Sequence, residues 1–338
     1  MASDHGGNVF EIARELNISP DEIVDLSSNV VDADLGVVRL RSRLPSEEPD
    51  ELERLIEEKF SFQRNSVLVN AGTSQFIKDI CCIFKNKKAL ILAPTYSEYE
   101  KQSRNFGLTV QYALSDEDNG FEFELEGINF SGFDVVFVCN PNNPTGVLLK
   151  KEGLLKTVKD NPNSFFVVDE AYMDFDFNRN SLLHQKLDNL CVLRSFSKLH
   201  GLAGLRIGWL YSSNGDFIEK LKALRPPWSV SEFALELAKA ALDTDFTKRI
   251  EEIVNLRDYL IKRLKGFEMV RVFDSHANFV LFRLSGDPED FFSYFKNNRL
   301  LLRSCENFYG LNKNFFRVSI KDRYSMELFL ELLEGYFK

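Results

Sequence analysis

Short apolar runs alternate with amphipathic helical stretches from residue 66 onward, and this alternation restricts the chain to few folds. Helical patterns lie between several of the runs, as at residues 74–84 and 152–159. Six runs have the length and composition of buried parallel strands: SVLVNA, ALILAP, DVVFVCN, SFFVVDE, LCVLRS and RIGWLYS. This order predicts an α/β domain with a mostly parallel sheet that is covered by helices on both faces.

The pattern changes beyond residue 215. Helical patterns at residues 216–223 and 232–264 precede the runs VRVFDS and NFVLFRL, a helix near 289–296, the runs LLLRSC and FFRVSI, and a last helix near 324–337. Such an order predicts a smaller α+β domain. We therefore expect a chain without a flexible linker, divided into residues 1–45 (N-terminal arm and small-domain segment), 46–235 (large domain) and 236–338 (small domain).

Composition excludes several classes of function. The chain has 338 residues, and this length suits about two domains. A net charge of −9 without a basic arm argues against nucleic-acid binding. The apolar runs are shorter than the roughly 18 residues of a membrane span, and the first residues lack a signal-peptide pattern. We expect a cytoplasmic protein that binds neither nucleic acid nor membrane.

The cysteines and histidines show no metal-binding pattern. The four histidines lack ligand spacing, and no Cys-x-x-Cys pair occurs. The five cysteines are odd in number and lie in apolar contexts, which favours free thiols over disulfides. We expect no metal site.

Polar residues follow four of the apolar runs, where the ends of parallel strands form ligand sites. In NAGTSQF, the N–H groups of Thr73 and Ser74 at a helix start could bind phosphate, although an ordinary capped turn is the alternative. In CNPNNPTG, a rigid loop could direct Asn142 or Asn143 at a ligand, unless the string is only a structural turn.

The other two strings carry charge. In FFVVDEAY, Asp169 and Glu170 end an apolar strand, and a buried carboxylate there needs a cation unless it caps a helix. In RSFSKLHGLAGLRIGW, Lys198 has hydroxyl residues before it and Arg206 after it. Burial among positive neighbours would lower the pKa of this lysine and make it a nucleophilic amine. A solvated surface lysine is the alternative.

Together the strings predict one anion site and one imine-forming amine. Asp169 can hold a protonated ring nitrogen, Lys198 can form the imine, and Asn143 and Tyr172 can tune a phenolate oxygen. A phosphate dianion can be bound by the remaining polar residues, which are Thr73, Ser74, Ser195, Ser197 and Arg206. Pyridoxal 5′-phosphate (PLP) is the cofactor that needs this set, and a small amino acid is the expected substrate.

The strings also resemble a known family over essentially the whole chain. GTS, NPNNPTG, VVDEAYMDF, SFSKLHGLAGLRIG and FFRVSI are similar, in this order, to the fold-type I PLP enzymes of the class I and II aminotransferase group. The resemblance implies the aspartate aminotransferase-like fold and a homodimer. It implies catalytic roles for Lys198 (Schiff base), Asp169 (pyridinium) and Tyr172 (phenolate). It further implies that Asn143 contacts the phenolate, Tyr96 stacks on the ring, Ser195 and Arg206 bind the phosphate, and Arg317 clamps the substrate carboxylate.

Two groups within this family share the compact length: histidinol-phosphate aminotransferases and the threonine-phosphate decarboxylases of cobalamin biosynthesis. Three strings are more similar to the decarboxylases: HGGNVFEIARELNISPDEIVDLSSN, RPPWSVSEFA around Trp228, and LLLRSCENFYGLNKNFFRVSI. They imply that the substrate phosphate lies near the start of the chain and that Arg303 lies beside the substrate carboxylate and phosphate. The expected substrate-binding residues are therefore His5, Gly7, Asn8, Asn143, Arg303 and Arg317.

Two strings depart from the family pattern. After SSN the chain reads VVDADLG where relatives have Ile-Asn-Pro-Leu-Gly, and LPSEEPD places Leu44 where relatives have a tyrosine. In the family that tyrosine reaches the cofactor phosphate of the partner subunit. The resemblance therefore does not extend to this cross-subunit contact.

The resemblance favours decarboxylation of L-threonine O-3-phosphate to aminopropanol phosphate. Transamination, for example of histidinol phosphate, is the first alternative, because the bond that breaks at Cα depends on a rotation that sequence spacing does not fix. A non-catalytic sensor with the same fold is the second alternative, and the intact Lys198 and Asp169 disfavour it.

Overall fold

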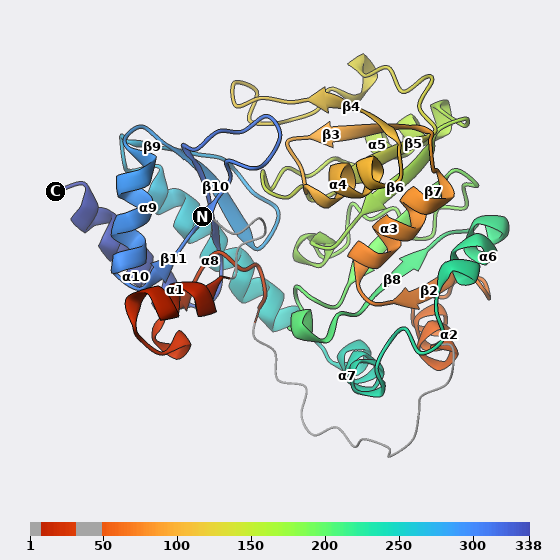
Figure 1. Cartoon of the computed structure of the whole chain (residues 1–338), viewed down its shortest axis with the longest axis horizontal. Helices are drawn as coiled ribbons and strands as arrows, with labels where there is room; N and C mark the ends of the chain where they lie inside the picture. Colours follow the sequence, from red (N-terminus) through yellow and green to blue (C-terminus); the bar gives the residue numbers. More distant parts are fainter. Residues whose placement is uncertain (1–7, 32–48) are drawn as a thin grey trace.

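The computed structural model describes residues 8–31 and 49–338, which form a larger and a smaller domain (Figure 1). The larger domain contains a seven-stranded sheet in the order β2-β8-β7-β6-β5-β3-β4. Its strands are β2 (Val67–Asn70), β3 (Lys88–Ala93), β4 (Thr109–Leu114), β5 (Val135–Cys139), β6 (Phe165–Asp169), β7 (Leu190–Ser195) and β8 (Gly208–Tyr211). The neighbours from β7 to β4 pair in parallel, which confirms the predicted α/β fold with a mostly parallel sheet.

Two strands differ from the sequence prediction. We expected RIGWLYS to be parallel, but β8 pairs antiparallel to β7 and β2, so this prediction was wrong. The loop from β7 to β8 holds the short helix η4 (Ala203–Leu205), whereas parallel neighbours need a longer crossover, usually an α-helix. We did not predict β4, because this edge strand is partly exposed and lacks a continuous apolar run.

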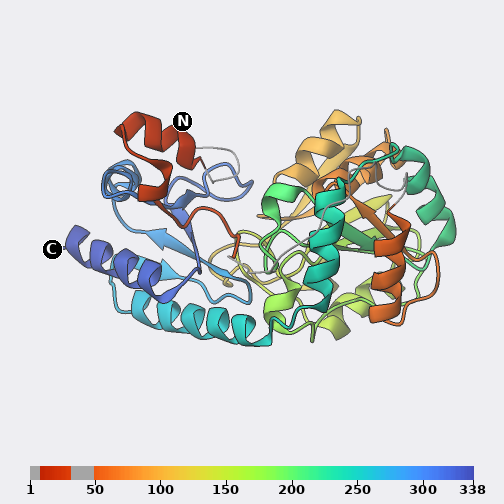
Figure 2. The ribbon, with the colours of Figure 1, turned by 90° about the horizontal axis from the view of Figure 1, so that it is seen from below.

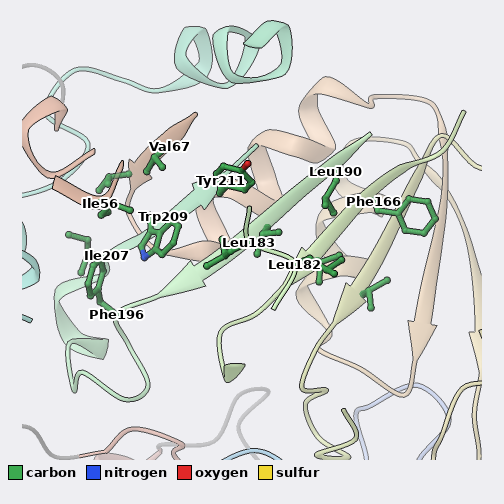
Figure 3. Close-up of a cluster of buried hydrophobic side chains, with 14 of the residues drawn as sticks. Ile56, Val67, Phe166, Leu182, Leu183, Leu190, Phe196, Ile207, Trp209 and Tyr211 are labelled. Carbon is green, nitrogen blue, oxygen red and sulfur yellow. The ribbon is translucent and has the colours of Figure 1, made fainter. Parts of the chain in front are cut away.

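Helices cover both faces of this sheet. One face packs against α2 (Asp50–Lys59), α5 (Lys151–Asp160) and α7 (Glu232–Asp243). Figure 3 shows part of this core, in which Trp209 and Tyr211 of β8 lie near Ile56 of α2. The other face packs against α3 (Thr73–Ile83), α4 (Glu98–Asn105) and α6 (Gly215–Leu224). Removal of these apolar side chains from water holds the helices to the sheet.

The smaller domain is built around an antiparallel sheet in the order β12-β13-β10-β9. Its strands are β9 (Val270–Val272), β10 (Phe279–Leu284), β12 (Arg303–Ser304) and β13 (Phe315–Ser319). The helices are α8 (Thr247–Leu264), α9 (Pro288–Asn297) and α10 (Arg323–Tyr336). Figure 2 shows α8 running from the large domain along the small one. This α+β arrangement agrees with the predicted fold class.

The first described segment packs on the small domain, although it begins the chain. It contains α1 (Val9–Leu16), the short helix η1 (Pro20–Glu22) and β1 (Val24–Asp25). β1 pairs in parallel with β11 (Leu300–Leu301), and Leu26 and Val31 join the core of the small domain. The remaining short helices are η2 (Leu125–Gly127) and η3 (Met173–Asp176).

Two predicted elements are divided in the structure. The helical pattern at 232–264 forms α7 and α8, and the run LLLRSC forms β11 and β12, which pair with different strands. Because α7 belongs to the core of the large domain and α8 to that of the small domain, we propose a boundary between Asp243 and Thr247.

Among residues 8–31 and 49–338, no helix is both long enough and apolar enough to cross a membrane. Across the same residues, no three metal-binding side chains are grouped. The five cysteines are free, and Cys82 is the one that is partly exposed.

A buried ion cluster joins the ends of β6 and β7 to the segment that follows β6. Arg194 donates to Glu170 Oε2 at 3.2 Å and also pairs with Asp174. Glu170 is fully buried and accepts bonds from Ser181 Oγ at 2.6 Å and the Leu182 N–H at 2.7 Å. A buried charge is costly unless it is paired, so this cluster depends on each partner.

We predict that Arg194→Met lowers the free energy of unfolding by about 3–5 kcal/mol, because Glu170 would stay buried without its cation. Arg104→Met is the matched control, because the exposed helical pair of Arg104 with Glu100 contributes only about 0.3–0.5 kcal/mol. Urea unfolding of both variants measures the difference. Equal losses in the two variants would contradict the role of the cluster.

Candidate active site

A cavity of about 200 Å³ lies where the ends of β2, β5, β6 and β7 face the small domain. The carboxyl ends of parallel strands are the usual ligand sites of open α/β sheets. Arg303 and Arg317 of the small domain line the cavity. So do all ten predicted cofactor-binding residues: Thr73, Ser74, Tyr96, Asn143, Asp169, Tyr172, Ser195, Ser197, Lys198 and Arg206.

One wall of the cavity can bind an anion. α3 begins at Thr73, and no described side chain caps its N-terminus, so its first N–H groups and the helix dipole are open to a phosphate. Gly72 has φ 84°, and a Cβ there would lie 2.7 Å from Arg206 Nη2. Glycine thus lets the guanidinium approach the helix start. The Ser197 N–H donates to Ser195 Oγ at 3.0 Å and fixes this hydroxyl at the same wall.

Asp169 ends β6 at the floor of the cavity. The Tyr99 hydroxyl donates to its Oδ2 at 2.9 Å, and the Ala171 N–H donates to its Oδ1 at 3.1 Å. Burial, the largest influence, raises the pKa of this carboxyl, whereas the two hydrogen bonds and the charge of Lys198 lower it. A buried carboxylate with these opposing influences on its pKa suits a cationic partner in the cavity.

Lys198 lies on the loop between β7 and β8. Its Nζ is 5.3 Å from the centre of the Tyr172 ring. Burial, and then the charge of Arg317, lower the pKa of this amine to about 8, while Asp169 opposes the shift. The structure therefore places in the cavity a lysine that is far more often neutral at physiological pH than a solvated one.

The Tyr172 hydroxyl is held by the first segment of the chain. Asn29 Nδ2 donates to it at 3.2 Å. Asn29 is itself fixed to the small domain, because its Oδ1 accepts from Ser319 Oγ at 2.5 Å and its backbone carbonyl accepts from Asn278 at 2.9 Å. This chain of bonds connects β13 to the cavity.

The two asparagines of NPNNPTG have different roles. Asn142 is buried and donates to Thr145 Oγ1 within its own loop and to the Pro94 carbonyl directly after β3, at 2.8 Å each. Asn143 lines the cavity, and its Oδ1 accepts from Arg317 Nη1 at 2.5 Å. The loop thus presents Asn143 to a ligand and uses Asn142 for its own structure.

Two arginines lie directly opposite each other on β12 and β13. Arg303 pairs with Arg317 in the antiparallel register, and each residue is 3% exposed. Arg303 donates to Asn307 Oδ1 at 2.6 Å, and Arg317 Nη2 donates to the Ser27 carbonyl at 2.9 Å. Arg317 Nε is buried without a hydrogen-bond partner among the described residues. Like charges in a cross-strand pair destabilise a sheet, so this pair suits anionic ligands.

One of the predicted substrate residues, Asn8, is not brought to this cavity, so this prediction was wrong. Asn8 lines a different cavity, between α1 and α9. His5 and Gly7 lie outside the described residues, as does Leu44.

Several residues of the cavity were missed in the sequence. Tyr99 and Asn29 hold predicted site residues through their side chains. Tyr99, the second residue of α4, comes three positions after Tyr96 in the chain, and Asn29 ends the string SSN. Other lining residues without a predicted role are Ser28, Ser97, Cys139, Ala171, Ala203 and Phe308.

The donor set fits PLP. The start of α3, the serine hydroxyls and Arg206 offer a phosphate site, which Gly72 keeps free of a Cβ. Asp169 can face a ring nitrogen, and Lys198 supplies an amine.

Comparisons with known proteins agree with this geometry. The chain is 31% identical to the adenosylcobalamin biosynthesis bifunctional protein CobDQ of Leptospira interrogans, over 94% of its own length but 39% of that relative. It is 28% identical to the threonine-phosphate decarboxylase of Salmonella typhimurium, over 98% of the chain and 96% of the relative. The crystal structure of the histidinol-phosphate aminotransferase from Clostridium acetobutylicum is 29% identical, with a TM-score of 0.81 over 87% of this chain and 90% of that one.

The family model for class I and II aminotransferases matches residues 38–333, which is most of the chain. This match confirms the resemblance that the sequence motifs carried. The protein therefore belongs to the class I and II aminotransferase family, and it is an enzyme whose cofactor is PLP.

Proposed function

We propose that this enzyme decarboxylates L-threonine O-3-phosphate to aminopropanol phosphate. The observation that carries the proposal is the buried pair of Arg303 and Arg317 at the cavity, which suits a substrate with two anionic groups. Guanidinium groups bind carboxylate and phosphate by paired hydrogen bonds. The similarity to the Salmonella decarboxylase over nearly the full length of both chains supports the same reaction.

Each of the two arginines binds a different anionic group of this substrate. Arg317 holds the carboxylate, because Asn143 and the Ser27 carbonyl fix its plane while Nε has no partner among the described residues. Arg303 holds the phosphate, and Asn307 orients it. The substrate is thereby held at both ends, which fixes the position of its Cα.

The cofactor site and Lys198 supply the chemistry. PLP, when bound, withdraws the electrons that are released at the substrate Cα. Thr73, Ser74, Ser195, Ser197 and Arg206 would hold its phosphate, Asp169 its ring nitrogen, Asn143 and Tyr172 its phenolate oxygen, and Tyr96 its ring face. Lys198 then returns a proton to Cα, for which a pKa of about 8 is well matched near neutral pH.

Transamination is the second candidate. The similarity to the Clostridium histidinol-phosphate aminotransferase favours it, and the same residues would serve it. In that reaction neutral Lys198 removes the proton from Cα. A sensor without turnover is the third candidate, and the presence of both Lys198 and Asp169 in one cavity disfavours it.

We also propose that the enzyme is a cytoplasmic homodimer. Trp228, in the loop before α7, and Phe233, the second residue of α7, are 47% and 42% exposed. Neighbouring exposed aromatic side chains of this kind suit a subunit interface. Sedimentation at several concentrations tests the assembly, and a monomer at every concentration would refute it.

The substrate proposal is tested by incubating the holoenzyme with phosphothreonine, histidinol phosphate and common amino acids, with and without 2-oxoglutarate. We expect carbon dioxide from phosphothreonine, without any need for 2-oxoglutarate. Keto-acid formation that requires 2-oxoglutarate would assign the enzyme to the aminotransferases. Absence of all products would favour the sensor.

We predict that the cofactor-free protein takes up PLP at a rate that rises with pH, with a midpoint of about 8, and then levels. Lys198 reacts as the neutral amine, which predominates above its lowered pKa. Arg317→Met should move this midpoint upward, because the Arg317 charge helps to lower the pKa. Visible absorbance of the bound cofactor measures the rate, and Lys198→Ala should abolish the band. A band that persists in Lys198→Ala would refute the assignment.

We predict that Arg303→Met raises the KM for phosphothreonine by about 30-fold or more, the loss expected when one partner of a buried charge pair is removed. The control is Arg299→Met, because Arg299 is exposed and pairs with Glu22 at 2.6 Å. Steady-state kinetics with phosphothreonine and with threonine measure the effect. If the preference for the phosphorylated substrate survives in Arg303→Met, Arg303 does not bind the phosphate.

A further inference from the structure

Tyr99 packs behind the candidate cofactor site. It is not one of the residues predicted to bind PLP. It is the second residue of α4 and is fully buried. Its ring stacks on Phe137, with centroids 5.3 Å apart and an angle of 12°. Its edge meets Tyr96, with centroids 5.6 Å apart and an angle of 87°. Packing on two sides therefore fixes where the Tyr99 hydroxyl points.

That hydroxyl is directed at Asp169. It donates to Oδ2 at 2.9 Å, while the Ala171 N–H donates to Oδ1 at 3.1 Å. Each carboxylate oxygen thus has one donor from the protein. A donor to a carboxylate stabilises its ionised form, and this effect is strong where water is excluded. Asp169 is 4% exposed, so solvent contributes little to its ionisation.

The other groups that face Asp169 do not replace Tyr99. Burial raises the pKa of Cys139 on β5 and of Cys191 on β7, so both thiols stay neutral near pH 7. Tyr96 and Tyr172 have pKa values of about 12 for the same reason. Lys198 favours the ionised carboxylate by its charge, but its own pKa of about 8 makes that charge partial. The Tyr99 hydroxyl, in contrast, is a hydrogen-bond donor to Asp169 that does not titrate near pH 7.

We propose that Tyr99 is a positioning residue that keeps Asp169 ionised and directed into the cavity. If PLP binds with its ring nitrogen at Asp169, the ionised carboxylate would favour the protonated form of that nitrogen. Without the hydroxyl, the buried carboxyl would take up this proton at a higher pH. The proposal concerns the cofactor site and is independent of the substrate.

The test compares PLP affinity across pH in Tyr99→Phe and in the parent enzyme. This substitution removes one oxygen and keeps the ring between Phe137 and Tyr96. The dissociation constant of PLP is measured by absorbance titration from about pH 5 to pH 9, a range that brackets the ionisation of a buried carboxyl. We expect the acid-side loss of affinity to move upward by about one to two pH units, as for the loss of one hydrogen bond to a charged group. The PLP phosphate titrates equally in each protein, so the difference reports on Asp169.

Two controls separate this role from a general structural one. Tyr211→Phe removes a buried hydroxyl that donates to the Gln185 carbonyl at 3.5 Å, far along the sheet, and should leave the midpoint unchanged. In an Asp169→Asn background, adding Tyr99→Phe should cause no shift, because the amide does not ionise.

Some outcomes would overturn the proposal. An unchanged midpoint in Tyr99→Phe means that the hydroxyl does not control Asp169. An equal shift in Tyr211→Phe, or in the Asp169→Asn background, means that the effect does not pass through the carboxylate.

Discussion

The ion pair between Glu170 and Arg194 fixes the two strand ends from which the active site is built. Neighbouring residues on a strand point to opposite faces, so Asp169 and Ser195 face the cavity while Glu170 and Arg194 meet behind it. Burial makes this pair costly to separate. This charge contact outside the cavity therefore adds to the β6–β7 ladder in holding the carboxylate of β6 beside the loop that carries Lys198.

Much of the large domain could be predicted from sequence, because its strands are buried on both faces and form continuous apolar runs. The direction of β8 could not, since it depends on how the Lys198 loop turns back. The strand β4 was not predicted, because an edge strand does not need a continuous apolar run. The division between α7 and α8 was equally hidden, because apolar periodicity continues through residues that pack on different domains.

The residues of the cavity could likewise be predicted only in part from the sequence. Chain order placed Asp169 and Lys198 at adjacent strand ends, where parallel topology brings them together. The choice between Asn142 and Asn143 required the actual hydrogen bonds. The facing arrangement of Arg303 and Arg317 required the strand register. The role of Tyr99 could not be predicted from the sequence, because a buried tyrosine on a helix is usually part of a core. Only its hydrogen bond to Asp169 distinguishes it.

Asn29 spans the seam between the domains, and this has a thermodynamic consequence. It is anchored to Ser319 and Asn278 of the small domain and touches Tyr172 of the large one. Any rotation of the small domain must therefore strain or release the Tyr172 contact. Occupancy at the arginines of β12 and β13 and occupancy beside Tyr172 are then energetically coupled. By reciprocity, whatever tightens one ligand through this bridge tightens the other by the same factor.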